Sequence, residues 1–291
     1  MALRARKPET VEKRLKLFLF GEHKVGKTIA ALQFPQAYLV DTEHGAEEKQ
    51  YVAAMLKAGS VYFASNDGDE IMTELRALHT DKHQHRTLII DPITTVYDDM
   101  LERAEAKVGT EFGRHYGVAN TAMKRMMNLI MRLDMNVIMT AHAKTEYGQN
   151  LAKLGTTFDG WKRLPYIFDL ILWMEARPTE TPTAPRRVVT VKGSRIEAFP
   201  LGDCFDWTYA EFNRRYGGAN LEREHKPEAL ATPEQIAELV RLLAVVNLPE
   251  GTPDKWLAKA GVDRFEDMPA AACAACIQYT NKLIGKKNGA S

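Results

Sequence analysis

A glycine-containing segment near the N-terminus has the residue types of a phosphate-binding loop. Residues 21–28 read GEHKVGKT, which matches the pattern G-x-x-x-x-G-K-[ST] in full. In such a loop the glycines permit a tight turn, and its backbone N–H groups converge on phosphate oxygens. We therefore expect nucleotide phosphates to be bound by the whole segment, which consists of Gly21, Glu22, His23, Lys24, Val25, Gly26, Lys27 and Thr28.

Three residues have specific expected roles in this nucleotide site. Lys27 should reach the β- and γ-phosphates, and Thr28 should coordinate Mg²⁺. A site for Mg²⁺ and a nucleotide also needs an acidic residue on a neighbouring strand, and Asp91 ends the apolar run TLIID. We expect Asp91 to hold a water on the metal and to orient Thr28. The sequence contains no guanine-reading N-K-x-D segment, so ATP is the expected nucleotide.

Hydrolysis also needs a group that positions the attacking water. Many ATPases have a glutamate directly after the strand-ending aspartate, but here Asp91 is followed by Pro92. The segment YLVDTEHG at residues 38–45 offers Glu43, two residues after Asp41 at the end of another apolar run. We expect Glu43 to face the γ-phosphate and accept a proton, and Asp41 to support the turn. The alternative for Glu43 is an acid that stabilises the N-terminus of the following helix.

The segments with these residues lie at the ends of alternating strands and helices. Short apolar runs predict strands, and amphipathic segments between them predict helices. The predicted strands are residues 15–20, 37–41, 60–65, 86–91, 136–142, 167–175 and 186–192, and the predicted helices are residues 27–34, 46–58, 69–79, 94–108 and 118–133. Apolar strands of this kind are buried on both faces, which predicts an α/β fold with a mainly parallel sheet.

Composition limits the class of protein. The chain has 291 residues, of which 45% are hydrophobic and 26% are charged, and its net charge is +1. No apolar run is long enough to span a membrane, and the first ten residues lack the apolar core of a signal peptide. With only three cysteines, the sequence predicts a protein of the cytoplasm, without a membrane partner.

The composition changes near residue 217, where turn residues and charges replace the periodic pattern. Beyond it, Thr232 and Gln235 have the types and spacing of a helix N-cap and its capping box. The chain is therefore expected to have four parts, which are an ATPase domain at residues 1–216, a linker at residues 217–231, a small helical domain at residues 232–285 and a disordered tail at residues 286–291.

Two loops combine cations with aromatic rings, a composition typical of surfaces that bind single-stranded DNA. The longer loop, residues 143–163, has no clear periodicity, and the shorter one covers residues 107–117. Cations can follow the phosphates and rings can stack on bases, although a solvated loop with a few anchoring rings is the alternative. The residues expected to contact DNA are Lys144, Lys153, Trp161, Lys162 and Arg163 in the longer loop and Arg114 and Tyr116 in the shorter one.

On these residues the chain resembles the RecA-like recombinases, and most of all the phage RecA-like ATPases linked with single-strand annealing and recombination. The stretch VDTEH resembles the Asp-x-Glu-His of RecA, which implies that Glu43 is the hydrolytic residue. The stretch NVIMTAH resembles the strand whose last residue senses the γ-phosphate. RecA has glutamine at that position, whereas this chain has His142, whose imidazole can donate a similar hydrogen bond.

Two later stretches extend the resemblance. GRHYGVANTAMKRMMNLIMRL resembles the first DNA-binding loop and its following helix, and VKGSRIEAF resembles a strand end with a basic pair. In the family that pair reaches the nucleotide of the neighbouring subunit, which implies this role for Lys192 and Arg195. A turn at the glycine and serine between them could bring the two cations together.

The resemblance implies a RecA-like P-loop NTPase core with ATP and Mg²⁺ as cofactors, to which this chain adds a small C-terminal helical domain. It implies an ATPase that DNA stimulates and a recombinase that binds single-stranded DNA and promotes annealing or strand pairing in phage recombination. The expected partners are single-stranded DNA, further copies of the chain in a filament or ring, and a single-strand-binding protein in the host cytoplasm. Two alternatives stay open: a hexameric DNA helicase or motor, and a P-loop regulatory ATPase that does not bind DNA.

Overall fold

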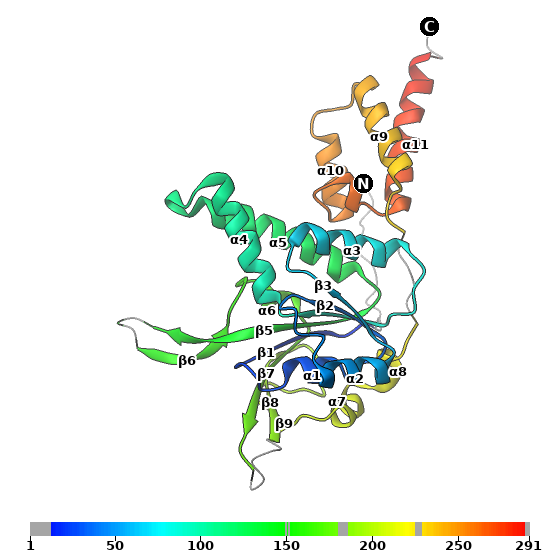
Figure 1. The fold of residues 1–291 in the computed structure, drawn as a ribbon. Coiled ribbons are helices and arrows are strands. Elements are labelled where there is room, and N and C mark those ends of the chain that lie inside the picture. The colour runs from blue at the N-terminus through cyan, green and yellow to red at the C-terminus, as the bar shows by residue number, and fades with distance from the viewer. Residues whose placement is uncertain (1–12, 149, 151, 180–185, 225–228, 289–291) are drawn as a thin grey trace.

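A large mixed sheet forms the centre of the molecule (Figure 1). The computed structural model describes residues 13–148, 150, 152–179, 186–224 and 229–288. Its strands are β1 (Lys16–Gly21), β2 (Ala37–Asp41), β3 (Val61–Ala64), β4 (Thr87–Asp91), β5 (Asn136–Tyr147), β6 (Lys153–Phe158), β7 (Leu170–Arg177), β8 (Arg186–Ser194) and β9 (Cys204–Asp206).

The strand order is β3-β2-β4-β5-β1-β7-β8-β9, with β6 paired to the outer part of β5. The strands from β3 to β7 in this order are parallel, whereas β6, β8 and β9 pair in the antiparallel direction. The carboxyl ends of the parallel strands therefore meet at one edge of the sheet, where ligands of such folds bind. The predicted α/β fold with a mainly parallel sheet is confirmed.

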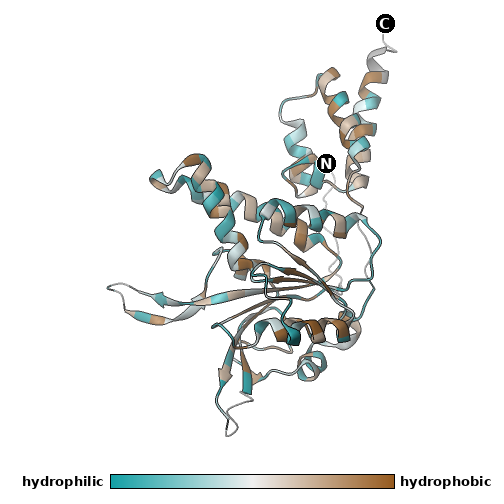
Figure 2. Cartoon of the chain, in the orientation of Figure 1, coloured by the Kyte–Doolittle hydropathy of each residue, from teal (hydrophilic) through white to brown (hydrophobic). Residues whose placement is uncertain are grey.

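Helices cover both faces of this sheet (Figure 1). One face carries α1 (Lys27–Ala31), α2 (Lys49–Ala58), α7 (Tyr209–Tyr216) and α8 (Gly218–Leu221), and the other carries α3 (Gly68–Thr80), α4 (Ile93–Val108) and α5 (Arg114–Arg132). Alternate residues of β1 separate into these two cores, with Leu17 and Leu19 on the first face and Phe18 and Phe20 on the second. Figure 2 shows the hydrophobic residues concentrated in the central strands and on the helix faces against them.

The predicted loop at residues 143–163 is wrong in its first part, because β5 continues to Tyr147 and pairs with β6. A 3-10 turn of three residues (Glu111–Gly113) and the short α6 (Leu164–Ile167) are further elements that the sequence did not predict. The β5–β6 hairpin projects from the molecule, and Tyr147 and Leu154 on it are 60% and 66% exposed. Phe158 at the base of the hairpin packs against the core beside Phe18, whereas the outer part is exposed and has no clear alternation of apolar and polar residues from which it could be predicted.

The predicted linker at residues 217–231 is also wrong in its first part. It begins with α8, whose Leu221 is fully buried against the first core. Arg14 donates hydrogen bonds of 2.7 Å and 2.6 Å to the carbonyl oxygens of Arg223 and Glu224. The chain up to residue 224 is therefore part of the ATPase domain, and residues 225–228 lie outside the described residues.

A small helical part follows, with α9 (Pro233–Val245), α10 (Thr252–Ala260), a 3-10 turn (Phe265–Asp267) and α11 (Ala270–Asn288). The capping box at the start of α9 is present, since the Thr232 hydroxyl accepts from the Gln235 amide and the Gln235 side chain accepts from the Thr232 amide. Because α11 runs to residue 288, the expected tail at residues 286–291 starts too early, and its last three residues lie outside the described part. None of the described helices is long and apolar enough to cross a membrane.

Candidate functional site

The phosphate loop follows β1 at the edge where the parallel strands end. Gly26 has a φ of 101°, a conformation that side chains disfavour, so the glycine permits the turn as predicted. Gly21 serves a different purpose, because a Cβ atom there would lie 2.4 Å from the carbonyl oxygen of Met174 on β7. The first glycine is therefore needed for the close approach of two strands, and the second for the path of the loop.

Lys27 begins α1 and points back over the loop. Its Nζ donates to the carbonyl oxygens of Gly21 and Glu22 at 2.9 Å and 2.8 Å, and the residue is 8% exposed. Burial lowers the pKa of Lys27, while the negative charges of Asp91, Glu43 and Glu22 oppose this shift. A buried ammonium without a carboxylate in hydrogen-bonding contact is well suited to an anionic ligand.

Thr28 and Asp91 are in direct contact, as the sequence predicts. The Thr28 hydroxyl donates to Asp91 Oδ2 at 2.6 Å, and Thr140 donates to the other carboxylate oxygen. Burial raises the pKa of Asp91, and these two hydrogen bonds oppose that rise. The pair fits Mg²⁺, because Thr28 supplies a hydroxyl oxygen and Asp91 can hold a coordinated water.

Asp41 supports the turn after β2, as predicted. Its carboxylate is 6% exposed and accepts hydrogen bonds from the Glu43 amide at 3.3 Å and the Ala46 amide at 2.7 Å. The helix α2 starts at Lys49 with no acidic residue in its first turn. Glu43 therefore lies outside the first turn of that helix, five residues before its N-cap Glu48, which favours the prediction that Glu43 acts at the nucleotide.

Glu43 instead meets His142 at the mouth of the same site. Glu43 Oε1 lies 2.9 Å from His142 Nε2, and both side chains are about half exposed. The structure therefore brings together the two residues for which the sequence predicts water activation and γ-phosphate sensing. They come from β2 and β5, on opposite sides of the strand that carries Asp91.

These groups face a single cavity of about 540 Å³. Glu22 and Val25 do not reach its wall, and Val25 is packed in the core. Five further residues on the wall were not predicted from the sequence as part of the site, namely Ile29, Gln50, Tyr51, Pro92 and Arg187. Gln50 and Tyr51 belong to α2, and Arg187 to β8. The complete lining is His23, Lys24, Gly26, Lys27, Thr28, Ile29, Glu43, Gln50, Tyr51, Asp91, Pro92, His142 and Arg187.

A second cavity of about 510 Å³ lies between α4, α5 and the base of the β5–β6 hairpin. It brings together most of the residues expected to contact DNA, since Tyr116, Lys144, Trp161, Lys162 and Arg163 all line it. The wall also has two carboxylates, Asp98 and Asp159, and burial raises the pKa of Asp98. Lys144 Nζ lies 2.6 Å from Asp159, so Lys162 and Arg163 supply the unpaired positive charge among the described residues of the wall.

Three of the residues expected to bind DNA are not placed as an exposed part of this cavity. Trp161 is 5% exposed and belongs to the core, so its ring has no open face for a base, and that expectation is wrong. Lys153 and Arg114 lie off the cavity, on β6 and at the start of α5. The sequence could not show that Trp161 is buried, because an aromatic residue in a polar loop fits either environment.

The two cavities are joined by hydrogen bonds around His142, in the middle of β5. The His142 amide donates to the Thr94 hydroxyl at 3.1 Å, and that hydroxyl donates to the Asp159 carbonyl at 3.0 Å. The Asp159 amide in turn donates to the His142 carbonyl at 2.8 Å. A displacement of the second cavity's wall would therefore act directly on the residue that contacts Glu43.

Lys192 and Arg195 do not converge in the subunit. Lys192 Nζ lies 4.6 Å from the centroid of the Trp173 ring, whereas Arg195 contacts Asp169 at 3.3 Å and the Tyr166 carbonyl at 2.9 Å. Because β8 runs antiparallel to β7, these residues lie toward the edge of the sheet opposite to the phosphate loop. Their role at a neighbouring subunit's nucleotide stays a prediction.

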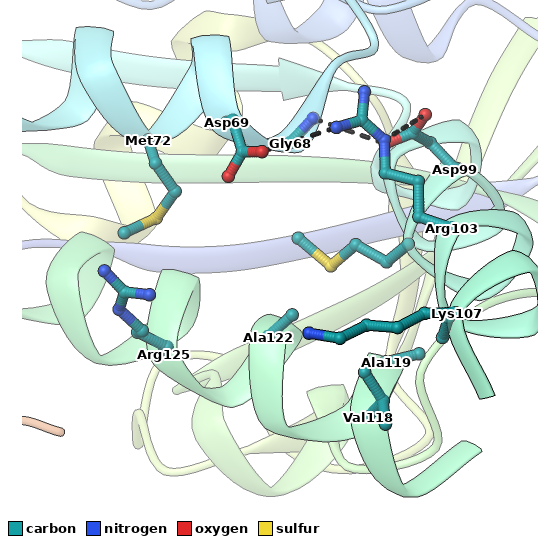
Figure 3. A pocket seen from close by; sticks show the side chains of 12 residues that line it. Gly68, Asp69, Met72, Asp99, Arg103, Lys107, Val118, Ala119, Ala122 and Arg125 are labelled. Atoms are coloured by element: carbon teal, nitrogen blue, oxygen red, sulfur yellow. Dashed lines mark hydrogen bonds and ion pairs between the residues drawn. The ribbon is translucent and has the colours of Figure 1, made fainter. Parts of the chain in front are cut away.

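A third cavity, of about 260 Å³, lies among α3, α4 and α5 (Figure 3). Its prominent cation is Arg103, which contacts Asp67, Asp69 and Asp99 at 2.6 Å, 3.4 Å and 2.9 Å. Three carboxylates thus surround the Arg103 guanidinium, and of the two other cations that line the cavity, Lys107 and Arg125, the latter is paired with Asp267. Within the described part of the chain there is no group of three or more metal-binding side chains.

A family model described as an AAA domain matches residues 13–198, which is well over half of the chain and includes the phosphate loop, Glu43, Asp91, His142 and Arg187. A search of curated proteins found none that matches.

Proposed function

The chain belongs to the AAA domain family and is a P-loop ATPase, and we propose that single-stranded DNA binds to it and stimulates its ATP turnover. AAA-type P-loop ATPases generally use ATP with Mg²⁺. In this proposal the nucleotide occupies the cavity at the phosphate loop, and DNA follows the second cavity. The observation that supports it best is the set of hydrogen bonds that connects His142, Thr94 and Asp159 between the two cavities.

The hydrolytic step is assigned to residues of the first cavity. Lys27 would bind the β- and γ-phosphates, and Thr28 and Asp91 would hold Mg²⁺, which when bound would supply positive charge for the transferred phosphoryl group. Glu43 orients the attacking water and accepts its proton. His142, which contacts Glu43 at 2.9 Å, fixes the direction of that carboxylate and donates to the γ-phosphate when Glu43 turns toward the water.

DNA binding is assigned to the cations of the second cavity. Lys162 and Arg163 are exposed and are the cations most available for phosphates, while Tyr116 is 53% exposed and offers a ring for a base. Lys144 leaves Asp159 to bind a phosphate, which frees the segment that carries the Asp159 carbonyl. Because Thr94 bonds to that carbonyl and to the His142 amide, the change reaches the nucleotide cavity.

We also infer the biological role from the likeness to RecA-like recombinases. The protein would promote annealing or strand pairing in recombination, as a filament or ring of identical subunits. Lys192 and Arg195 would then serve the nucleotide of the adjacent subunit. A single-strand-binding protein is the expected further partner.

The DNA assignment is tested by the salt dependence of binding. Anisotropy of a labelled single strand is measured from low to high salt with a slowly hydrolysed ATP analogue, for the parent and for the double variant Lys162→Ala, Arg163→Ala. Each phosphate contact on a single strand contributes a slope of roughly 0.7 in log K against log salt, so the variant should lose about 1.4.

The matched control is Lys255→Ala with Lys282→Ala, which removes two exposed charges from the helical part and should leave the slope unchanged. An equal slope in the parent and the first variant would mean that DNA follows another surface. If the parent bound the ATP analogue but no DNA at any salt concentration, DNA stimulation would have to be abandoned and the ATPase assignment would remain.

A further inference from the structure

Arg187 reaches the nucleotide cavity from a side of the sheet that the hydrolytic residues do not occupy. It lies near the start of β8 and pairs with Ala176 on β7. The strands that carry Glu43, Asp91 and His142 lie on the other side of β1, in the order β2, β4 and β5. The cavity therefore has a hydrolytic side and an opposite side, and Arg187 is the cation on the opposite side.

The Arg187 side chain packs directly on the phosphate loop. A Cβ atom placed on Gly26 would lie 2.2 Å from Arg187 Nε and 3.1 Å from Cζ, so the guanidinium covers this glycine. Arg187 Nε is buried and, among the described residues, it has no hydrogen-bonding partner. A guanidinium cannot lose its charge at ordinary pH, so a buried one requires an anion or several acceptors.

The carboxylates nearby are already engaged with other groups. Asp91 accepts from Thr28 and Thr140, and Glu43 contacts His142. The two arginines closest to Arg187 in the sheet do have acidic partners, since Arg186 pairs with Asp206 and Arg177 with Glu175. Arg187 is thus the member of this group for which the described part of the chain supplies no carboxylate.

We propose that Arg187 binds non-bridging oxygens of the α- and β-phosphates of the nucleotide held by its own subunit. This inference rests on the nucleotide site proposed above. The backbone amides of such a loop surround the α- and β-phosphates, and Arg187 covers Gly26 in that loop. The γ-phosphate faces the hydrolytic side, where Glu43, His142 and the Thr28–Asp91 pair lie. The planar guanidinium can donate two parallel hydrogen bonds to phosphate oxygens.

This position predicts which step Arg187 affects. The α- and β-phosphates are present in ATP and in ADP, so a contact to them is made before and after hydrolysis. A group that binds both states equally changes affinity and leaves the rate of the bound complex nearly unchanged. Arg187 would accordingly determine how tightly ADP is retained after hydrolysis.

The test is a comparison of ligands that contain different parts of the nucleotide. Calorimetry without DNA measures the binding of Mg-ADP, a Mg-bound slowly hydrolysed ATP analogue and Mg-pyrophosphate to the parent and to Arg187→Ala. We expect all three affinities to fall by about tenfold or more, the loss typical of a charge-assisted hydrogen-bonding group. Arg187→Lys, which keeps the charge and loses the fork, should show a smaller loss.

The matched control is Arg186→Ala, one residue earlier on β8 and paired with Asp206, which should keep each affinity within about twofold of the parent. Thermal unfolding without ligand shows whether each variant is folded, and Arg187→Lys keeps the aliphatic packing on Gly26 should Arg187→Ala be unstable.

Three results would overturn the inference. Unchanged affinities would mean that Arg187 has a structural role, and a loss restricted to the ATP analogue would place it at the γ-phosphate. A loss for ADP without a loss for pyrophosphate would place it at the base or ribose. Failure of the parent to bind any of the three ligands would refute the nucleotide site itself, whereas failure to bind DNA affects only the DNA proposal.

Discussion

Two regions of the molecule gather several cations, and they differ in what surrounds the charges. Where the helical part meets the ATPase domain, Asp267 is 3% exposed and accepts from Arg76 at 2.9 Å and Arg125 at 2.9 Å, while Arg132 donates to its carbonyl oxygen at 2.8 Å. At the phosphate loop, Lys27 and Arg187 have no carboxylate in hydrogen-bonding contact among the described residues.

The cations around Asp267 should contribute to stability, whereas those at the phosphate loop should contribute to ligand binding. Breaking a buried ion pair by removing one partner is strongly destabilising, so Asp267 should hold the two parts together. A buried cation without a carboxylate contributes little to stability, because its desolvation is not offset. Its value lies in binding an anion that arrives from outside. The two regions should therefore respond in opposite ways when a charge is removed.

Lys27→Ala should give the largest effect on ATP turnover, and it tests the expectation that the cations at the phosphate loop serve ligand binding. Removing one preorganised donor from a transition state costs about a hundredfold to a thousandfold in rate, and we expect ATP turnover to fall by an amount in this range. Thermal unfolding of the ligand-free variant should stay close to that of the parent. Lys57→Ala, an exposed lysine at the end of α2, is the control. Retained turnover would remove Lys27 from the site.

Asp267→Ala tests the expectation that the ion pairs of Asp267 stabilise the folded protein. We expect a loss of about 3 kcal/mol in the free energy of unfolding, since the side chains of Arg76 and Arg125 are only 29% and 24% exposed and would lose their acidic partner. Nucleotide affinity at a temperature where the variant is folded should not change. Urea unfolding measures the loss, with Glu266→Ala as an exposed control on the same turn. A stability equal to that of the parent would show that the arginines do not depend on Asp267.

Glu43→Gln sharpens the comparison within the nucleotide cavity. Glutamine keeps the length and the contact with His142 but cannot accept a proton at neutral pH. A positioned base is worth roughly a hundredfold or more, so turnover should fall by that factor while ATP affinity stays within a few-fold. Steady-state kinetics and nucleotide binding measure the two quantities. Glu48→Gln, at the N-cap of α2, should behave as the parent.

Lys16 is a third buried cation, and within the described residues its hydrogen-bonding partners are the carbonyl oxygens of Leu133 and Met135, at 3.2 Å and 3.1 Å. Burial lowers the pKa of Lys16 to about 7, while the charges of Asp169 and Asp134 oppose this shift. Because the pKa is lower in the folded state, the unfolded chain binds more protons between about pH 7 and pH 10. The parent should therefore become more stable as the pH rises through this window.

The slope expected from one such group is at most about 1.4 kcal/mol per pH unit, and Lys16→Met should lack it. Urea unfolding of both proteins at pH 7.5, 8.5 and 9.5 gives the difference in stability, which should shift in favour of the parent as the pH rises. A constant difference would mean that Lys16 titrates in the folded protein as it does in the unfolded chain.

The nucleotide cavity was largely predictable from the sequence because its signals are local. A strand, a loop of eight residues and a helix follow one another directly, and Asp41, Glu43 and Asp91 each come at the end of an apolar run. The carboxyl ends of parallel strands lie at one edge, so these residues had to meet once the strands were identified. The contact between Glu43 and His142 follows from the same rule.

Arg187 and Trp161 could not be placed from the sequence. Whether Arg187 lies at the edge of the sheet with the phosphate loop depends on the direction of β8. The apolar stretch VVTV could form a parallel or an antiparallel strand, so the residues of the strand do not show this direction. That direction also moves Lys192 and Arg195 away from the subunit's own phosphate loop. Trp161 stands in a polar segment, and only the packing of the core under the hairpin shows that its ring is buried.

Coupling of the two cavities through His142, Thr94 and Asp159 is tested most directly by ATP turnover of the parent protein as single-stranded DNA is added. Coupling between sites is commonly worth 1–3 kcal/mol, and we expect turnover to rise by about tenfold or more and to saturate together with DNA binding. Thr94→Val, which removes the hydroxyl between His142 and Asp159, should keep the basal rate and lose most of the rise. Turnover that stays constant at DNA concentrations that saturate binding would contradict this coupling.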